Sequence, residues 1–208
     1  MTKKFPDRRY PNAGAFLTDY ARTVAEALNS VRPSEIDRAV AELKRAIAHN
    51  NLIFSCGNGG SAAIANHLTC DCSKGIATDT TLRPRVMSLS ATVELITAIA
   101  NDIEYAEVFV HQLRNAARPG DVLITISSSG NSENIVRALA WARANGLVTI
   151  ALSGFSGGRS TQTADINLHI AAENYGIVED AHQSLMHIMA QYVRMSEIPA
   201  DRVAALGF

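Results

Sequence analysis

The sequence predicts an α/β fold in which one parallel sheet is covered by helices on both faces. Five short apolar runs alternate with amphipathic helical segments, the pattern of repeated βαβ units. Two of the runs end in loops rich in glycine and serine. The chain has 208 residues, 47% of them hydrophobic, which suits one domain with one substantial core.

Two helices are expected before the first strand. Apolar residues at spacings of three and four predict one helix over 13–31 and a second that starts at Pro33 and ends at Asn50-Asn51. Since both come before any strand, we expect a hairpin used for packing or for assembly. We treat residues 1–50 as a helical extension of an α/β core over 51–196, within one domain over 1–208.

Strands and helices then alternate along the rest of the chain. Strands are predicted over 52–56, 85–89, 122–126, 148–152 and 166–170, and helices over 62–72, 93–100, 105–117, 133–145 and 177–195. In sheets of this kind ligands sit beyond the carboxyl ends of the strands. Both glycine- and serine-rich loops fall at such ends.

The loop Ser127-Ser128-Ser129-Gly130-Asn131-Ser132 joins a strand to a helix. A helix N-terminus offers unpaired N–H groups and a partial positive charge, which together attract anions. An ordinary strand–helix turn needs one capping serine or asparagine, and here there are five such residues. The composition favours a site for phosphate or another small anion.

The loop Cys56-Gly57-Asn58-Gly59-Gly60-Ser61 occupies the same kind of position. Its glycines allow positive φ and a close approach of backbone to ligand. No Gly-Lys-Ser/Thr follows, so this is not the phosphate loop of nucleoside triphosphatases, and it does not complete a dinucleotide fingerprint. Two loops of this kind suit one compact phosphorylated sugar better than a dinucleotide.

Composition excludes several other classes of function. The formal net charge is −1, which argues against nucleic-acid binding. No run approaches 18 uninterrupted apolar residues, so no membrane span is expected. Three cysteines are an odd number for a disulfide framework, which favours a cytoplasmic protein.

Four side chains on two helices form a candidate metal site. His67 and Asp71 are four residues apart on one predicted helix, and Glu179 and His187 are eight apart on the last. Two imidazoles and two carboxylates are suitable ligands for zinc or a similar divalent ion. The alternative is that each pair makes ordinary surface or capping hydrogen bonds.

Three motifs together resemble the sugar isomerase (SIS) domain. These are the two loops above and Ala98-Ile99-Ala100-Asn101-Asp102, in order and at plausible spacing. Within that family the chain looks most like the phosphoheptose isomerases, which convert sedoheptulose 7-phosphate to a heptose 7-phosphate. The resemblance implies a flavodoxin-like five-stranded parallel sheet and a homotetramer with active sites at subunit interfaces.

The resemblance also assigns site residues. Four serines match the family's phosphate-binding positions: Ser127, Ser128, Ser129 and Ser132. A second set matches positions that line the substrate: Asn58, Ser61, Asn101 and Asp102, with Gly59 in the same loop as Asn58. His67, Asp71, Glu179 and His187 correspond to the family's zinc ligands. Here Asp71 replaces a glutamate and Glu179 replaces a glutamine, which is compatible with a compensated site, a different substrate or a lost activity.

The mechanism implied is aldose–ketose isomerisation through an enediol, a sugar-phosphate isomerase reaction. Asp71 is the expected base with Glu179 as its alternative, and His187 is the expected acid with His182 in reserve. A divalent metal, zinc in the family, would stabilise the charge that develops between the two oxygens. The alternatives are a non-catalytic SIS module that binds a sugar phosphate or bridges proteins, and an isomerase of another ketose phosphate.

Overall fold

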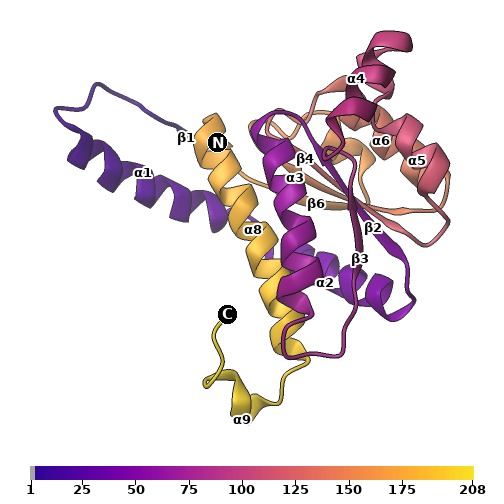
Figure 1. The fold of residues 1–208 in the computed structure, drawn as a ribbon. Helices are drawn as coiled ribbons and strands as arrows, with labels where there is room; N and C mark the ends of the chain where they lie inside the picture. The colour runs from indigo at the N-terminus through magenta and orange to yellow at the C-terminus, as the bar shows by residue number, and fades with distance from the viewer. Residues whose placement is uncertain (1–2) are drawn as a thin grey trace.

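The computed structural model describes residues 3–208 and contains a five-stranded parallel sheet with the order β3-β2-β4-β5-β6 (Figure 1). This is the flavodoxin-like order, so the predicted fold class is confirmed. The strands are β2 (Leu52–Gly57), β3 (Arg85–Ser88), β4 (Val122–Ser127), β5 (Val148–Ser153) and β6 (Ile166–His169). A small parallel pair, β1 (Lys3–Lys4) with β7 (Ala172–Glu173), was not predicted.

Helices cover both faces of the sheet. On one face lie α2 (Pro33–Ala48), α3 (Gly60–Cys70) and α8 (Tyr175–Ser196), and α1 (Ala13–Leu28) packs against α8. On the other lie α4 (Val93–Asp102), the 3₁₀ turn η2 (Tyr105–Glu107), α5 (Val110–Ala116), α6 (Glu133–Ala144) and α7 (Ser160–Thr163). A short α9 (Ala200–Val203) follows α8. None of the helices within 3–208 combines the length and the apolar character needed to cross a bilayer.

Each central strand supplies side chains to both layers of the core. Ile53 and Ile124 belong to the cluster packed under α2, α3 and α8, whereas Phe54 and Leu123 belong to the cluster under α5 and α6. The alternation follows from the two-residue period of a strand. All six residues of β4 are buried, as expected for a strand with helices on both sides.

The clearest differences between the predicted and the observed helices are in three places. The helix expected over 62–72 is α3, followed by a π-helical turn, η1 (Asp71–Ile76). The helix expected over 105–117 is divided into η2 and α5. The last helix starts at Tyr175, because the Asn174 side chain accepts a hydrogen bond from the Ile177 N–H at 3.0 Å.

The N-terminal helices are tied to the sheet by a buried carboxylate. Glu35 on α2 is 6% exposed and accepts hydrogen bonds from the Asn167 N–H and from Arg38 Nη1, both at 2.9 Å. The Asn167 N–H and, to a smaller extent, the Arg38 guanidinium lower the pKa of Glu35. The charged form of this side chain therefore stabilises the contact between α2 and β6.

We expect Glu35→Gln to lower the free energy of unfolding by about 1–3 kcal/mol at neutral pH, because bonds to a charged acceptor become bonds to a neutral one. The pKa is lower in the folded chain, so this stabilisation is present above the ordinary carboxyl pKa and is lost as pH falls through the folded pKa. In urea denaturation, the gap between wild type and variant should shrink as the pH is lowered.

The matched control is Asp37→Asn on the exposed side of the same helix, which should change the unfolding free energy little. A gap between wild type and Glu35→Gln that stays constant with pH would show that the charge of Glu35 is not what stabilises the contact.

Candidate active site

The serine loop (residues 127–132) connects β4 to α6 and turns sharply at Gly130, where φ is +64°. The Gly130 N–H donates to the Ser127 carbonyl at 3.1 Å and lies 3.2 Å from Ser127 Oγ. Ser128 is 5% exposed, and its Oγ has no hydrogen-bond partner among the described residues. A buried hydroxyl without a partner is costly unless a ligand completes its bonding.

A third glycine-rich loop, residues 154–159 after β5, packs against the serine loop and is hydrogen-bonded to it. The Gly154 N–H donates to the Ser128 carbonyl at 2.9 Å, and the Arg159 N–H donates to Asn131 Oδ1 at 3.0 Å. A Cβ at Gly130 would lie 2.0 Å from the Gly157 carbonyl oxygen, so only glycine permits this packing. The serine loop is therefore rigidly placed.

The asparagine loop (residues 57–61) connects β2 to α3 on the neighbouring strand. Asn58 pairs reciprocally with Asn134 on α6, with amide-to-amide distances of 2.9 and 3.0 Å. The Tyr105 hydroxyl also donates to Asn58 Oδ1 at 2.8 Å. The side-chain amide of Asn58 thus links this loop to α6, which begins at the end of the serine loop.

The two loops enclose a polar cleft of about 180 Å³ at the point where the strand order reverses. Its lining is Asn58, Ser61, Ile126, Ser127, Ser128, Ser129, Ser132, Tyr175 and Glu179. The structure thus brings both predicted loops to one site. Gly59, whose φ is +54°, forms the turn of the asparagine loop.

Asn101 and Asp102 do not line this cleft. Both are exposed at the end of α4, where Asn101 Nδ2 donates to Asp102 Oδ1 at 2.7 Å. Tyr175 lines the cleft, and Tyr105 and Asn134 support it, although no sequence pattern indicated these three residues.

Glu179 lies at the cleft rather than beside the histidines. A Cβ at Gly60 would fall 2.4 Å from Glu179 Oε2, which places the carboxylate against the first residue of α3. Glu179 precedes His187 by eight residues, a helical rise of about 12 Å. Sharing a helix face therefore does not bring these two side chains to one metal ion within this subunit.

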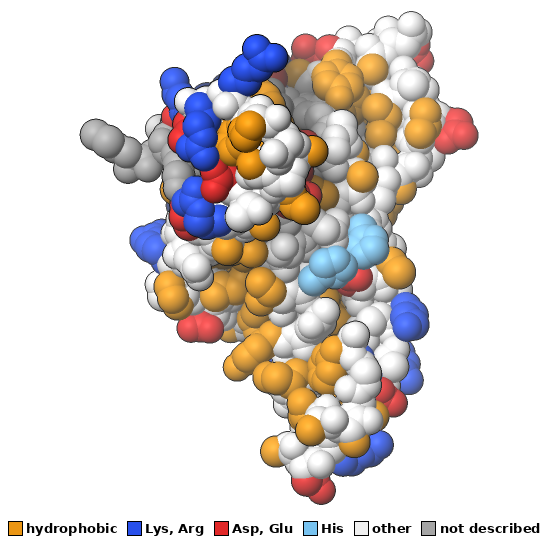
Figure 2. All heavy atoms as spheres, turned by 90° about the vertical axis from the view of Figure 1, so that its left-hand side faces the viewer, with side chains coloured by type: hydrophobic (Ala, Val, Ile, Leu, Met, Phe, Trp, Pro, Cys, Tyr) orange, Lys and Arg blue, Asp and Glu red, His pale blue; other side chains and the backbone are white. Residues whose placement is uncertain are grey.

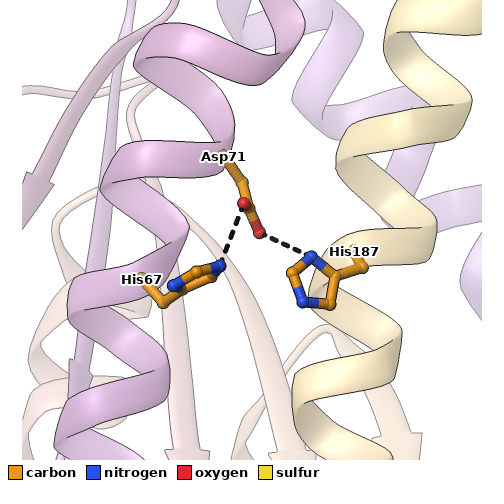
Figure 3. Close-up of side chains that lie close together, drawn as sticks. All are labelled: His67, Asp71 and His187. Carbon is orange, nitrogen blue, oxygen red and sulfur yellow. Dashed lines mark ion pairs between the residues drawn. The ribbon is translucent and has the colours of Figure 1, made fainter. Parts of the chain in front are cut away.

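The other three predicted metal ligands meet between α3 and α8 (Figure 3). Asp71 lies between two imidazoles: its Oδ1 is 3.2 Å from His67 Nε2, and its Oδ2 is 3.2 Å from His187 Nδ1. The two rings meet edge to face with centroids 5.1 Å apart. We call these three residues the triad.

The triad fits a divalent cation. The three ligand atoms lie within 4.8 Å of one another, and Asp71 Oδ2 is buried without a hydrogen-bond partner among the described residues. Two histidines and one carboxylate are the ligand set of many catalytic zinc sites, which keep a fourth position open. Asp71 begins the π-helical turn, a type of distortion that is frequent at functional sites.

His182, the reserve acid of the sequence hypothesis, cannot fill that role. It is 0% exposed within the core, and burial lowers its pKa to about 4. The ring is therefore neutral at physiological pH and has no access to a substrate. Its contribution is to the packing of α8.

Comparison with known proteins identifies the family of the chain. Residues 17–154 match the family model of the SIS domain. The chain is 35% identical over 167 residues to the phosphoheptose isomerase of Mycobacterium tuberculosis, covering 76% of this chain and 84% of that protein. The chain belongs to the SIS domain family.

Other relatives give the same family. This SIS domain is 32% identical over 178 residues to the phosphoheptose isomerase of Alteromonas mediterranea, covering 84% of the chain and 89% of the relative. It superposes on the solved phosphoheptose isomerase of Neisseria gonorrhoeae with a TM-score of 0.79 and 28% identity, covering 87% of this chain and 96% of that one. The family resemblance seen in the three sequence motifs is therefore confirmed.

The buried His182 makes stability depend on pH. Its folded pKa of about 4 lies below the ordinary 6.5, so the unfolded chain takes up the proton first. The stabilisation is complete above pH 6.5 and is lost as pH falls toward 4, at about 1.4 kcal/mol per pKa unit, or about 3 kcal/mol in all. We expect His182→Met to reduce the fall in unfolding free energy over this range.

The control is His49→Gln, since His49 is exposed at the end of α2 and should leave the pH profile unchanged. Should His182→Met lose stability between pH 6.5 and 4 as steeply as wild type, proton uptake by His182 would not be the cause.

Proposed function

We propose that this SIS domain is a phosphoheptose isomerase, which interconverts sedoheptulose 7-phosphate and D-glycero-D-manno-heptose 7-phosphate through an enediol. One observation carries the proposal. The polar cleft beside the serine loop and the His/Asp/His triad lie at two different positions along the axes of the same two helices, α3 and α8. The names of the relatives above support the same reaction.

The spacing of the two sites matches the substrate. From Gly60 to His67 the rise of α3 is about 10 Å, and from Glu179 to His187 the rise of α8 is about 12 Å. In a 2-ketose 7-phosphate, the reacting carbons C1 and C2 are at the opposite end of the carbon chain from the phosphate. A phosphate in the serine loop would therefore direct the reacting carbons toward the triad.

The serine loop would hold the phosphate by hydroxyl groups and by the N-terminus of α6. This binding would orient the distant carbons, so that interactions away from the reaction contribute to catalysis. Ser128, with its unpartnered Oγ, is the residue that we expect to gain most from a bound phosphate.

Asp71 would take the proton from C1 of the ketose as O2 is protonated to give the enediol, and His187 would return a proton at C2 as O1 loses its proton and becomes the aldehyde oxygen. The pair is suited to this exchange because one carboxylate oxygen faces an imidazole nitrogen at 3.2 Å. Glu179, at the phosphate end, would contact the middle of the sugar chain. It remains the alternative base, since its carboxylate also borders the cleft.

His67, Asp71 and His187 would hold a divalent cation, which we propose to be zinc. Such an ion, when bound, polarises the carbonyl and hydroxyl oxygens of a substrate and stabilises negative charge on them. Three of the four predicted ligands are together in this subunit, which is the number of protein ligands in catalytic zinc sites.

We also propose that the protein works as a homotetramer in the cytoplasm. Figure 2 shows hydrophobic side chains spread over the face that carries α1 and α8, with histidine side chains on the same face. Leu17 on α1 is 66% exposed, and Ile188 and Tyr192 on α8 are 47% and 50% exposed. Three free cysteines suit a reducing compartment.

The decisive test is exchange of solvent deuterium into C1 of sedoheptulose 7-phosphate, followed by NMR with zinc present. We expect wild type to exchange, and Asp71→Asn to lose at least about 10²-fold in rate, since a positioned base contributes roughly that much. Glu179→Gln should act mainly on KM. Asp71→Asn must still bind inorganic phosphate as wild type does, which shows an intact serine loop.

The contrary outcomes identify the alternatives. Loss of exchange in Glu179→Gln with full rate in Asp71→Asn would transfer the base role to Glu179. Exchange with a shorter ketose phosphate but not with the seven-carbon one would assign another substrate. Binding of sugar phosphates without any exchange would make the chain a binding module.

Assembly is tested separately by light scattering after size-exclusion chromatography. We expect a mass of four chains for wild type and a smaller species for Leu17→Glu, because a charge in an apolar contact is costly to bury. A wild-type mass of one chain would contradict the tetramer.

A further inference from the structure

Gln183 occupies the position between the two sites. Tyr175, Glu179, Gln183 and His187 follow one another at intervals of four along α8 and therefore lie on one side of it. The first two line the cleft, and His187 belongs to the triad. Gln183 is half-buried and faces the triad end of this row.

The side-chain amide of Gln183 contacts Nε2 of His187, the ring nitrogen that faces away from Asp71. Gln183 Nε2 is 3.0 Å from His187 Nε2, while His187 Nδ1 is 3.2 Å from Asp71 Oδ2. Each ring nitrogen of His187 therefore has a polar neighbour, the amide of Gln183 at Nε2 and the carboxylate of Asp71 at Nδ1.

The orientation of this amide determines which nitrogen of a neutral His187 carries the proton. An amide N–H can only donate, so the ring nitrogen that it meets is an acceptor and carries no proton. In that orientation of the amide the proton is on Nδ1, the atom that lies 3.2 Å from Asp71 Oδ2. In this form His187 can give a proton on the Asp71 side, but its Nδ1 lone pair is not available to a cation.

An amide can reverse this assignment without moving the backbone. Rotation by 180° presents Gln183 Oε1 to His187, and an oxygen accepts a bond from Nε2–H. The Nδ1 lone pair is then free to bind a cation. Histidines that bind metals usually donate their second N–H to an oxygen in this way.

We propose that Gln183 is a positioning residue that holds His187 in either of two tautomers, one with Nδ1–H facing Asp71 and one with Nδ1 open to a divalent cation. The proposal rests on the proposed function for the role of His187. It adds a residue outside the cleft lining and outside the triad that determines which role His187 can take.

The first test uses metal-free protein and needs no activity. Long-range ¹H–¹⁵N NMR of the histidine rings identifies the protonated nitrogen of His187, assigned by its loss in His187→Gln. We expect Nδ1–H in wild type and a mixture of tautomers in Gln183→Met, which has a similar length and cannot donate. Gln162→Met on the exposed side of α7 is the matched control and should keep the wild-type signal.

The second test measures zinc affinity by competition with a chromogenic chelator. Gln183→Met should weaken binding by about 10- to 100-fold, the usual effect of removing such a partner. Gln183→Glu, which still offers an oxygen to Nε2–H, should bind zinc at least as tightly as wild type. Thermal unfolding of each variant establishes that the fold is retained.

The inference is overturned if Gln183→Met keeps the wild-type tautomer, or if its zinc affinity is within twofold of wild type. Its failure is distinguishable from failure of the proposed function. A protein that shows both effects of Gln183 but no deuterium exchange would retain this residue's role and lose the isomerase reaction. A protein that exchanges deuterium while Gln183→Met behaves as wild type would do the reverse.

Discussion

The burial of one face of α8 is the constraint on which the site depends. Ile177, Ala181, Leu185 and Met189 are all within 3% of full burial, in the cluster shared with α3 and the sheet. Removing this much apolar surface from water fixes the rotation of the helix about its axis. The polar side chains of the same helix, from Tyr175 to His187, must then face α3 and the two loops.

The sheet determines where the two loops lie relative to these side chains of α8. β2 and β4 are neighbours and run parallel, so the loops after them leave at the same edge. The asparagine loop leads into α3 and the serine loop into α6, and the amide pair of Asn58 and Asn134 joins the loop before α3 to the first turn of α6. The cleft and the triad are thus two levels of one rigid arrangement.

Local sequence patterns predicted the elements of the fold and about half of the site, whereas the flavodoxin-like five-stranded sheet came from the resemblance to the SIS family. The five strands, the helical pair before them and both loops follow from periodicity and from glycine and serine at strand ends. The triad residues His67 and Asp71 could be paired because four-residue spacing is a local property. Nothing local indicates Tyr105 or Asn134, because their partner Asn58 is 47 and 76 residues away.

The placement of Glu179 shows the limit of helix-face reasoning. Spacing correctly put it on the side of α8 that carries His187, but a shared face says nothing about distance along the axis. Which level of α3 it meets depends on how the two helices are offset, and tertiary packing sets that offset. Gln183 could not be predicted for a related reason. A glutamine on a helix has no distinctive sequence pattern, and its role depends on where the ring of His187 lies.

The lining of the cleft also bears on how a ligand would respond to salt. Among the described residues that line it, none is lysine or arginine, and the one charged side chain is the carboxylate of Glu179. Attraction by hydroxyls, N–H groups and a helix terminus acts over short distances inside a narrow space, where mobile ions screen little. Selectivity for a phosphate would then come from the shape of the serine loop, and binding would vary little with ionic strength.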